Sequence, residues 1–233
     1  MIEELNERPQ SNFGRRRWPK LALGAVALVA LSAGTGWGAA HLAAQNAGSP
    51  DVAKVRAALK LQALWFLRPG ELRTLEWADV DLSQLQVTLP AERMKMRESL
   101  AVPLANQALT ILQELKPLTM GSRYIFPSAT SEARPMSNNA VLSALRRMGI
   151  DKADMSGHGF RSSARTILDE VLGERVDLIE HQLAHKVRDV NGRAYNRTTH
   201  LPERRKMMQR WADYLDTLRT GGNVIAGKFG RVA

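Results

Sequence analysis

Residues 158–197 read HGFRSSARTILDEVLGERVDLIEHQLAHKVRDVNGRAYNR, and this stretch holds most of the side chains that point to a fold and a chemistry. Apolar residues at helical spacing predict helices over residues 159–172 and 176–185. A helix that opens near His158 places His158 and Arg161 on one face, because residues three apart are neighbours on a helix. The positive end of the helix dipole then favours an anion at this place.

Two further side chains lie at the end of the second of these helices and beyond it. His185 closes the segment QLAH, and Tyr195 comes ten residues later in GRAYNR. Gly192 and its polar neighbours predict a mobile segment around Tyr195. Such a segment suits a nucleophile that must move into position for attack. Taken singly, His185 also fits a structural histidine, and Tyr195 fits a partly buried tyrosine.

Upstream, two short segments carry charged residues at turns. LRPGELR, residues 67–73, places Arg68 before a Pro-Gly turn and Glu71 three residues later, so the two side chains can pair on a helix. ERMKMR, residues 92–97, forms a basic turn that contains Lys95. Ordinary readings exist for these residues too: a surface arginine, a glutamate favoured at a helix start, and a lysine in a turn. The histidine and arginine of HGFR likewise fit solvated residues at a helix start.

The rest of the pattern predicts a mainly α fold with a small antiparallel β-sheet. Alternation over 85–90 and 99–104 predicts two strands that flank the basic turn. Similar patterns predict helices over 51–67, 71–78, 105–115, 137–148 and 203–218, and a strand over 124–128. The last helix has an apolar stripe that packs either on its own domain or on a neighbouring copy of the chain, formed by Met208, Trp211, Leu215 and Leu218.

Composition narrows the function classes. The chain has 33 Lys and Arg against 23 Asp and Glu, a net charge of +10, and residues 1–47 hold only +2 of it (five basic minus three acidic side chains). A basic globular body predicts a polyanionic partner, most often nucleic acid, although a basic solvated surface gives the same count. The chain has no cysteines, which excludes disulfides, thiolate catalysis and cysteine-ligated zinc.

The first 47 residues differ from the remainder. Residues 1–20 are polar and basic, which predicts a disordered start. Residues 21–44, LALGAVALVALSAGTGWGAAHLAA, contain no Asp, Glu, Lys or Arg. About 20 helical residues span the roughly 30 Å of a bilayer core, so this segment predicts a single membrane anchor, with the preceding basic cluster keeping the N-terminus in the cytoplasm. A signal peptide is one alternative, but it lacks a convincing cleavage site, and a soluble Ala-rich helix is the other.

The chain resembles the catalytic domain of tyrosine recombinases, in particular integrases of the satellite-prophage type. The resemblance lies in five segments that follow one another along the chain and in the tail after them: RPGELR, ERMKM, HGFR, LAH, GRAYNR and RRKMMQRWADYLD. Five ordered matches arise by chance far less often than one motif. The resemblance implies an integrase-like catalytic domain over residues 48–220 and a flexible tail at 221–233. It also implies a bacterial protein that works in the cytoplasm, where its DNA is.

The resemblance implies that the chain cuts and rejoins double-stranded DNA. Tyr195 is expected to attack a phosphodiester and to form a 3′-phosphotyrosyl link, which conserves the bond energy, so no ATP, metal or other cofactor is expected. Arg68 and Arg161 are expected to donate hydrogen bonds to the non-bridging oxygens of the phosphate, where negative charge builds up in the transition state. His185 is implied to donate a further hydrogen bond to the same phosphate.

Three more roles complete the implied site. Lys95 is expected to protonate the departing 5′-oxygen, and His158 to assist proton transfer at the tyrosine. Glu71 is expected to pair with Arg68 or to orient a neighbour. Integrases of this type carry arm-binding and core-binding domains ahead of the catalytic domain, and this sequence has neither. A catalytically idle DNA-binding fragment or gene remnant is therefore the alternative to an active recombinase, and a membrane protein that contacts lipid headgroups is a third.

Overall fold

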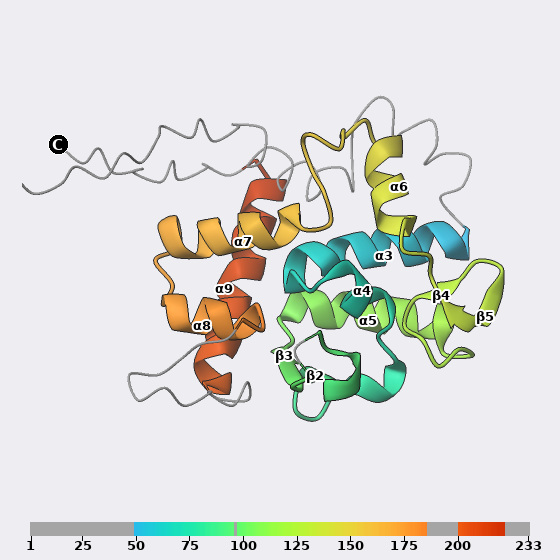
Figure 1. Cartoon of the computed structure of the whole chain (residues 1–233), viewed down its shortest axis with the longest axis horizontal. Helices are drawn as coiled ribbons and strands as arrows, with labels where there is room; N and C mark the ends of the chain where they lie inside the picture. Colours follow the sequence, from blue (N-terminus) through green and yellow to red (C-terminus); the bar gives the residue numbers. More distant parts are fainter. Residues whose placement is uncertain (1–48, 96, 186–199, 222–233) are drawn as a thin grey trace, which may run out of the picture.

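The computed structural model describes residues 49–95, 97–185 and 200–221 (Figure 1). The predictions for the N-terminal segments 1–20 and 21–44, for Tyr195 and for the tail beyond residue 221 therefore fall outside the described residues. The helices are α3 (Pro50–Trp65), α4 (Pro69–Arg73), α5 (Asn106–Thr119), α6 (Ala140–Arg147), α7 (Gly159–Glu170), α8 (Val176–Gln182) and α9 (Leu201–Arg219), with 3₁₀ turns η1 (Trp77–Asp79) and η2 (Ala91–Arg93). The strands are β1 (Val80–Asp81), β2 (Gln86–Leu89), β3 (Leu100–Pro103), β4 (Pro127–Ser128) and β5 (Ser131–Pro135).

Helix α3 lies at the centre of the fold and packs against α4, α5, α6, α7 and α9 (Figure 1). Its side chains are apolar on most sides, as in Leu61 and Trp65, and such a helix is stable only when it is buried on several sides. It ends at Phe66, which has a left-handed φ of 40°. The Phe66 ring is fully buried and meets Trp211 edge to face at 6.2 Å. This packing fixes the unusual turn that leads the chain into Arg68.

A three-stranded antiparallel sheet in the order β1-β2-β3 lies beside the helices. Val87 pairs with Val102, and Leu89 pairs with Leu100. All four side chains are buried. Strand β2 alternates between buried and exposed positions, whereas β3 is buried along its length and packs against α9. The predicted pair of strands around a basic turn is therefore confirmed, and the turn that contains Lys95 connects β2 to β3.

The apolar stripe of α9 is buried within its own chain. Met208, Trp211, Leu215 and Leu218 all lie in the core. The Trp211 indole N–H donates to the carbonyl of Ala63 on α3 at 3.0 Å. Of the two packings expected for this stripe, the structure has the one on its own domain.

The structure differs from the sequence-based prediction in the region of residues 71–78. One helix was expected there, but α4 ends at Arg73 and the chain then pairs with a distant segment. The backbone N–H of Ile125 donates to Leu75, and that of Trp77 donates to Arg123, both at 2.9 Å. This long-range pairing overrides the local helical period. At Tyr124 this pairing is an isolated antiparallel bridge to Glu76, and of the predicted strand over 124–128 only β4 forms a continuous strand.

Two short strands, β1 and β5, were not predicted. Strand β5 reads SEARP and carries exposed or half-buried side chains at the edge of a two-stranded sheet, so it has no alternating apolar pattern to signal it. The mainly helical fold with small antiparallel sheets is nevertheless as expected. Within the three ranges given above, no helix is long and apolar enough to cross a membrane.

Candidate active site

The start of α4 fixes Arg68 and Glu71 against each other. Pro69 occupies the first helical position, where its missing N–H leaves no hydrogen bond unmade. The Glu71 carboxylate accepts the Arg68 backbone N–H at 3.0 Å and the Arg68 Nη1 at 2.8 Å. Glu71 is only 5% exposed. This charge-assisted pair therefore holds the Arg68 guanidinium in one place, and it is the pairing that the three-residue spacing suggested.

Arg161 lies in the first turn of α7 and is 7% exposed, so it is not a solvated helix-start residue. Its Nη1 donates to the Phe66 carbonyl at 2.8 Å, and its Nη2 donates to the Leu183 carbonyl at 2.6 Å. These carbonyls lie at the ends of α3 and α8, so one side chain ties three helices together. A guanidinium has five N–H donors, and two are used in this way. The remaining N–H groups of Arg161 can donate to His185 and to a ligand.

The Arg68 and Arg161 guanidinium groups lie close enough for their charges to interact. The pKa of the Arg161 guanidinium is lowered to about 10, first by burial and then by the nearby positive charge of Arg68, while Glu71 and Glu180 oppose the shift. Arg161 still carries its proton at neutral pH. A phosphate between the two guanidinium groups would accept hydrogen bonds from both and cancel their repulsion.

His185 reaches the same point through the end of α8. Ala184 has a left-handed φ of 52°, and the backbone N–H groups of Ala184 and His185 donate to the carbonyls of His181 and Glu180, both at 3.0 Å. This hydrogen-bond pattern closes a helix with a left-handed residue. It turns His185 back over α8. Its Nδ1 lies 2.5 Å from Oε2 of Glu180, and its Nε2 lies 3.5 Å from Nη2 of Arg161.

Among the described residues, no hydrogen bond or ion pair joins the side chains of His158 or Lys95 to this group. His158 is the exposed residue that precedes α7, one turn ahead of Arg161. Lys95 is exposed in the connection between β2 and β3. Tyr195 lies outside the described residues. The structure thus brings together Arg68 with its partner Glu71, Arg161 and His185.

The sequence reasoning missed Glu180 and its part in holding His185. Five residues apart on a straight helix, the two side chains would point in different directions. They meet only because Ala184 is left-handed. No pattern in the sequence marks that conformation, since alanine rarely adopts it.

Arg204 on α9 was also missed. It is fully buried, and burial lowers the pKa of its guanidinium to about 10. Its Nη2 donates to the Ala101 carbonyl and to Oε1 of Gln182, both at 2.6 Å. Arg204 therefore joins α9 to β3 and to the helix that leads into His185. Nothing in the segment PERRK distinguishes this buried arginine from its exposed neighbour Arg205.

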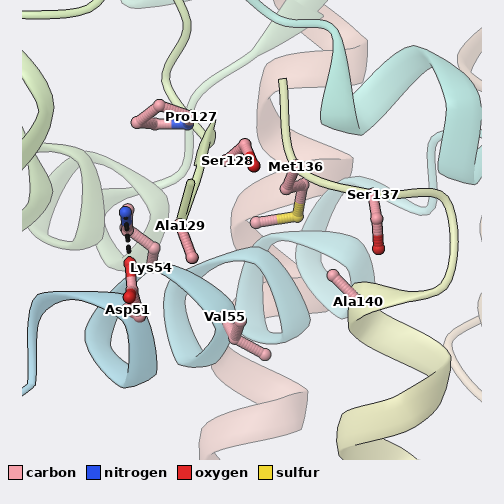
Figure 2. A pocket seen from close by; sticks show the side chains of 9 residues that line it. All are labelled: Asp51, Lys54, Val55, Pro127, Ser128, Ala129, Met136, Ser137 and Ala140. Carbon is pink, nitrogen blue, oxygen red and sulfur yellow. Dashed lines mark ion pairs between the residues drawn. The ribbon is translucent and has the colours of Figure 1, made fainter. Parts of the chain in front are cut away.

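A separate pocket of about 200 Å³ lies between α3 and the β4–β5 hairpin (Figure 2). Asp51 and Lys54 at its edge form an ion pair of 2.5 Å, so these two charges compensate each other. None of the predicted site residues lines this pocket. Among the described residues, no three His, Asp or Glu side chains come together as metal ligands would.

The chain is similar in sequence to phage and prophage integrases. The model of the phage integrase family matches residues 40–200. The integrase of Enterobacteria phage P4 is 42% identical over 178 residues, which cover 70% of this chain and 40% of that protein. Prophage integrase IntA of Escherichia coli (strain K12) is 41% identical over 164 residues, which cover 70% of this chain and 39% of that protein. The chain thus spans about two fifths of the length of these curated relatives.

Among solved structures, the XerA recombinase has a TM-score of 0.51 and 15% sequence identity, with 86% of this chain and 63% of that chain covered. At this level of identity the likeness concerns the fold alone. It agrees with a helical core that carries small antiparallel sheets.

Proposed function

This chain belongs to the phage integrase family of tyrosine recombinases, and from that premise we propose that it cuts and rejoins DNA through a covalent link to Tyr195. The observation that carries the proposal is the proximity of three side chains: His185 Nε2 lies 3.5 Å from Arg161 Nη2, and Arg68 lies close enough to lower the pKa of Arg161. Two fixed guanidinium groups and an imidazole suit a phosphodiester whose non-bridging oxygens gain charge during the reaction.

In the proposed step, the phenolic oxygen of Tyr195 attacks phosphorus and the bond to the 5′-oxygen breaks. The tyrosine loses a proton, a transfer we assign to His158, and the leaving oxygen gains one from Lys95. One phosphate ester replaces another. Rejoining is the reverse reaction, in which a 5′-hydroxyl attacks and the tyrosine leaves, so the cycle needs no external energy source.

The other tyrosines of the chain support Tyr195 as the nucleophile. The chain has three tyrosines. Tyr124 and Tyr214 are each 8% exposed. Burial raises the pKa of the Tyr214 phenol, which disfavours the phenolate. The Tyr124 hydroxyl accepts a hydrogen bond from Arg123 at 2.6 Å. Neither of them suits attack on a bulky DNA phosphate.

The test of the function is adduct formation by the purified full chain. The probe is a pool of labelled duplexes with a randomised centre, each nicked so that the short 5′-hydroxyl fragment diffuses away after cleavage. We expect a protein–DNA adduct that survives denaturing detergent and a free 5′-hydroxyl on the released fragment. DNA binding without any adduct would instead support the alternative hypothesis, in which the chain binds DNA but does not cut it.

Replacing Lys95 with alanine tests its assignment as general acid. We expect adduct formation on ordinary DNA to slow by about 10²–10⁴-fold, because an alkoxide leaves poorly without a proton. With sulfur in place of the bridging 5′-oxygen the rate should recover to near that of the unmodified chain, since a thiol with a pKa near 8.5 leaves without protonation. The measurement is the single-turnover rate of adduct formation on the oxygen substrate and on the sulfur substrate.

The matched control is Lys116→Ala, which removes an exposed lysine on α5 and should leave both rates unchanged. If Lys95→Ala slowed the reaction equally on the oxygen and sulfur substrates, Lys95 would not be the general acid.

A further inference from the structure

We propose that Glu180 is a positioning residue, which fixes the ring of His185 so that its Nε2 faces Arg161 and the phosphate. The orientation of the His185 ring follows from its contacts with Glu180 and Arg161. The effect of Glu180 on DNA cleavage rests on the proposed function. Glu180 touches neither Arg161 nor the expected phosphate position through a hydrogen bond; it acts through His185.

Both carboxylate oxygens of Glu180 are engaged. Oε2 lies 2.5 Å from Nδ1 of His185, and Oε1 accepts from Nε of Arg165 at 2.9 Å. Arg165 also pairs with Asp169 at 3.6 Å. The Glu180 side chain is only 21% exposed. The carboxylate is therefore held between helices α7 and α8, with one oxygen directed at the imidazole.

This contact determines which ring nitrogen of His185 carries the proton. An ionised carboxylate can only accept, so Nδ1 must donate to it. In the neutral ring, Nε2 then has a free lone pair and accepts from Arg161, 3.5 Å away. When a phosphate occupies the site, Nε2 is the nitrogen that faces it. The negative charge of the phosphate then favours a second proton on the ring, which Nε2 donates to it.

Among the described residues, Glu180 is the main restraint on this ring. The side chain of His185 is 44% exposed, so packing alone leaves room for ring rotation. Without the carboxylate, the ring can turn over and take the other tautomer. The nitrogen presented to the phosphate is then no longer defined, although the backbone turn at Ala184 is unchanged.

The first arm of the test reads the tautomer directly and needs no activity. Nitrogen-15 NMR, recorded where the ring carries a single proton, should show His185 protonated on Nδ1. Glu180→Ala should shift the signals towards protonation on Nε2. Asp169→Asn, which alters the other partner of Arg165, should leave them unchanged. A wild-type ring protonated on Nε2 would overturn the proposal.

The second arm measures adduct formation on the nicked duplex pool. Glu180→Ala should slow it by about 10- to 100-fold, by analogy with the loss of a carboxylate that orients a metal-binding histidine. Glu180→Gln should recover most of the rate, because its amide oxygen still accepts from Nδ1. A fully active Ala variant, or a Gln variant as slow as Ala, would refute the positioning role. No adduct from the wild-type chain would count against the proposed function, and the NMR arm would still decide on Glu180.

Discussion

Tyr195→Phe is expected to abolish the protein–DNA adduct, a loss of at least about 10⁴-fold, because the substitution removes the nucleophilic oxygen and leaves the ring. DNA binding should persist, since one hydroxyl adds little to a binding energy dominated by phosphate charges. In the wild-type chain, digestion with trypsin should place the covalent nucleotide on the peptide of residues 194–197. The other two tyrosines fall in different peptides, residues 124–146, since trypsin does not cleave between Arg134 and Pro135, and residues 211–219.

Matched controls come from the two remaining tyrosines. Tyr124→Phe and Tyr214→Phe should both retain the adduct, because these side chains are buried and so cannot reach a DNA phosphate. Persistence of the adduct in Tyr195→Phe, or its mapping to either of the other peptides, would show that the nucleophile is wrongly assigned.

Arg161→Ala is expected to abolish cleavage and also to weaken the fold. The sequence alone suggested a residue that only grips phosphate. In the structure its Nη1 and Nη2 satisfy the carbonyls of Phe66 and Leu183. Two buried acceptors left without donors should lower the free energy of unfolding by about 2–5 kcal/mol. Thermal unfolding and adduct formation, measured on the same sample, separate the two effects.

Two further variants distinguish catalysis from stability. Arg161→Lys keeps the charge but has a single ammonium in place of the planar fork, so cleavage should stay severely reduced while the fold recovers in part. Arg146→Ala is the control, because Arg146 also donates to two backbone carbonyls, of Ile150 at 2.6 Å and Met155 at 3.0 Å. It should lower the unfolding temperature and retain cleavage well below that temperature. A fully active Arg161→Lys would remove Arg161 from the phosphate site.

Much of the site could be predicted because its residues lie in short segments with strong local signals. Arg68 before Pro-Gly and Arg161 in HGFR at a helix start each combine a charged residue with a local structural signal; the roles of Lys95, His158 and Tyr195 stay predictions. The pairing of Arg68 with Glu71 follows from helical spacing alone. Glu180 and Arg204 could not be found in this way, because their partners depend on a left-handed alanine and on a strand about a hundred residues away.

By itself, the sequence determined the family, the helix-rich architecture and the choice of Arg68, Arg161 and His185 as candidate site residues, because periodicity and motif order are local properties of a chain. Only the tertiary structure decided how these side chains are held. Long-range pairing at Leu75 and Ile125 replaced a predicted helix, and the carbonyls that end α3 and α8 converge on the Arg161 guanidinium. Burial of that guanidinium lowers its pKa, and burial is a property of packing that no local pattern encodes.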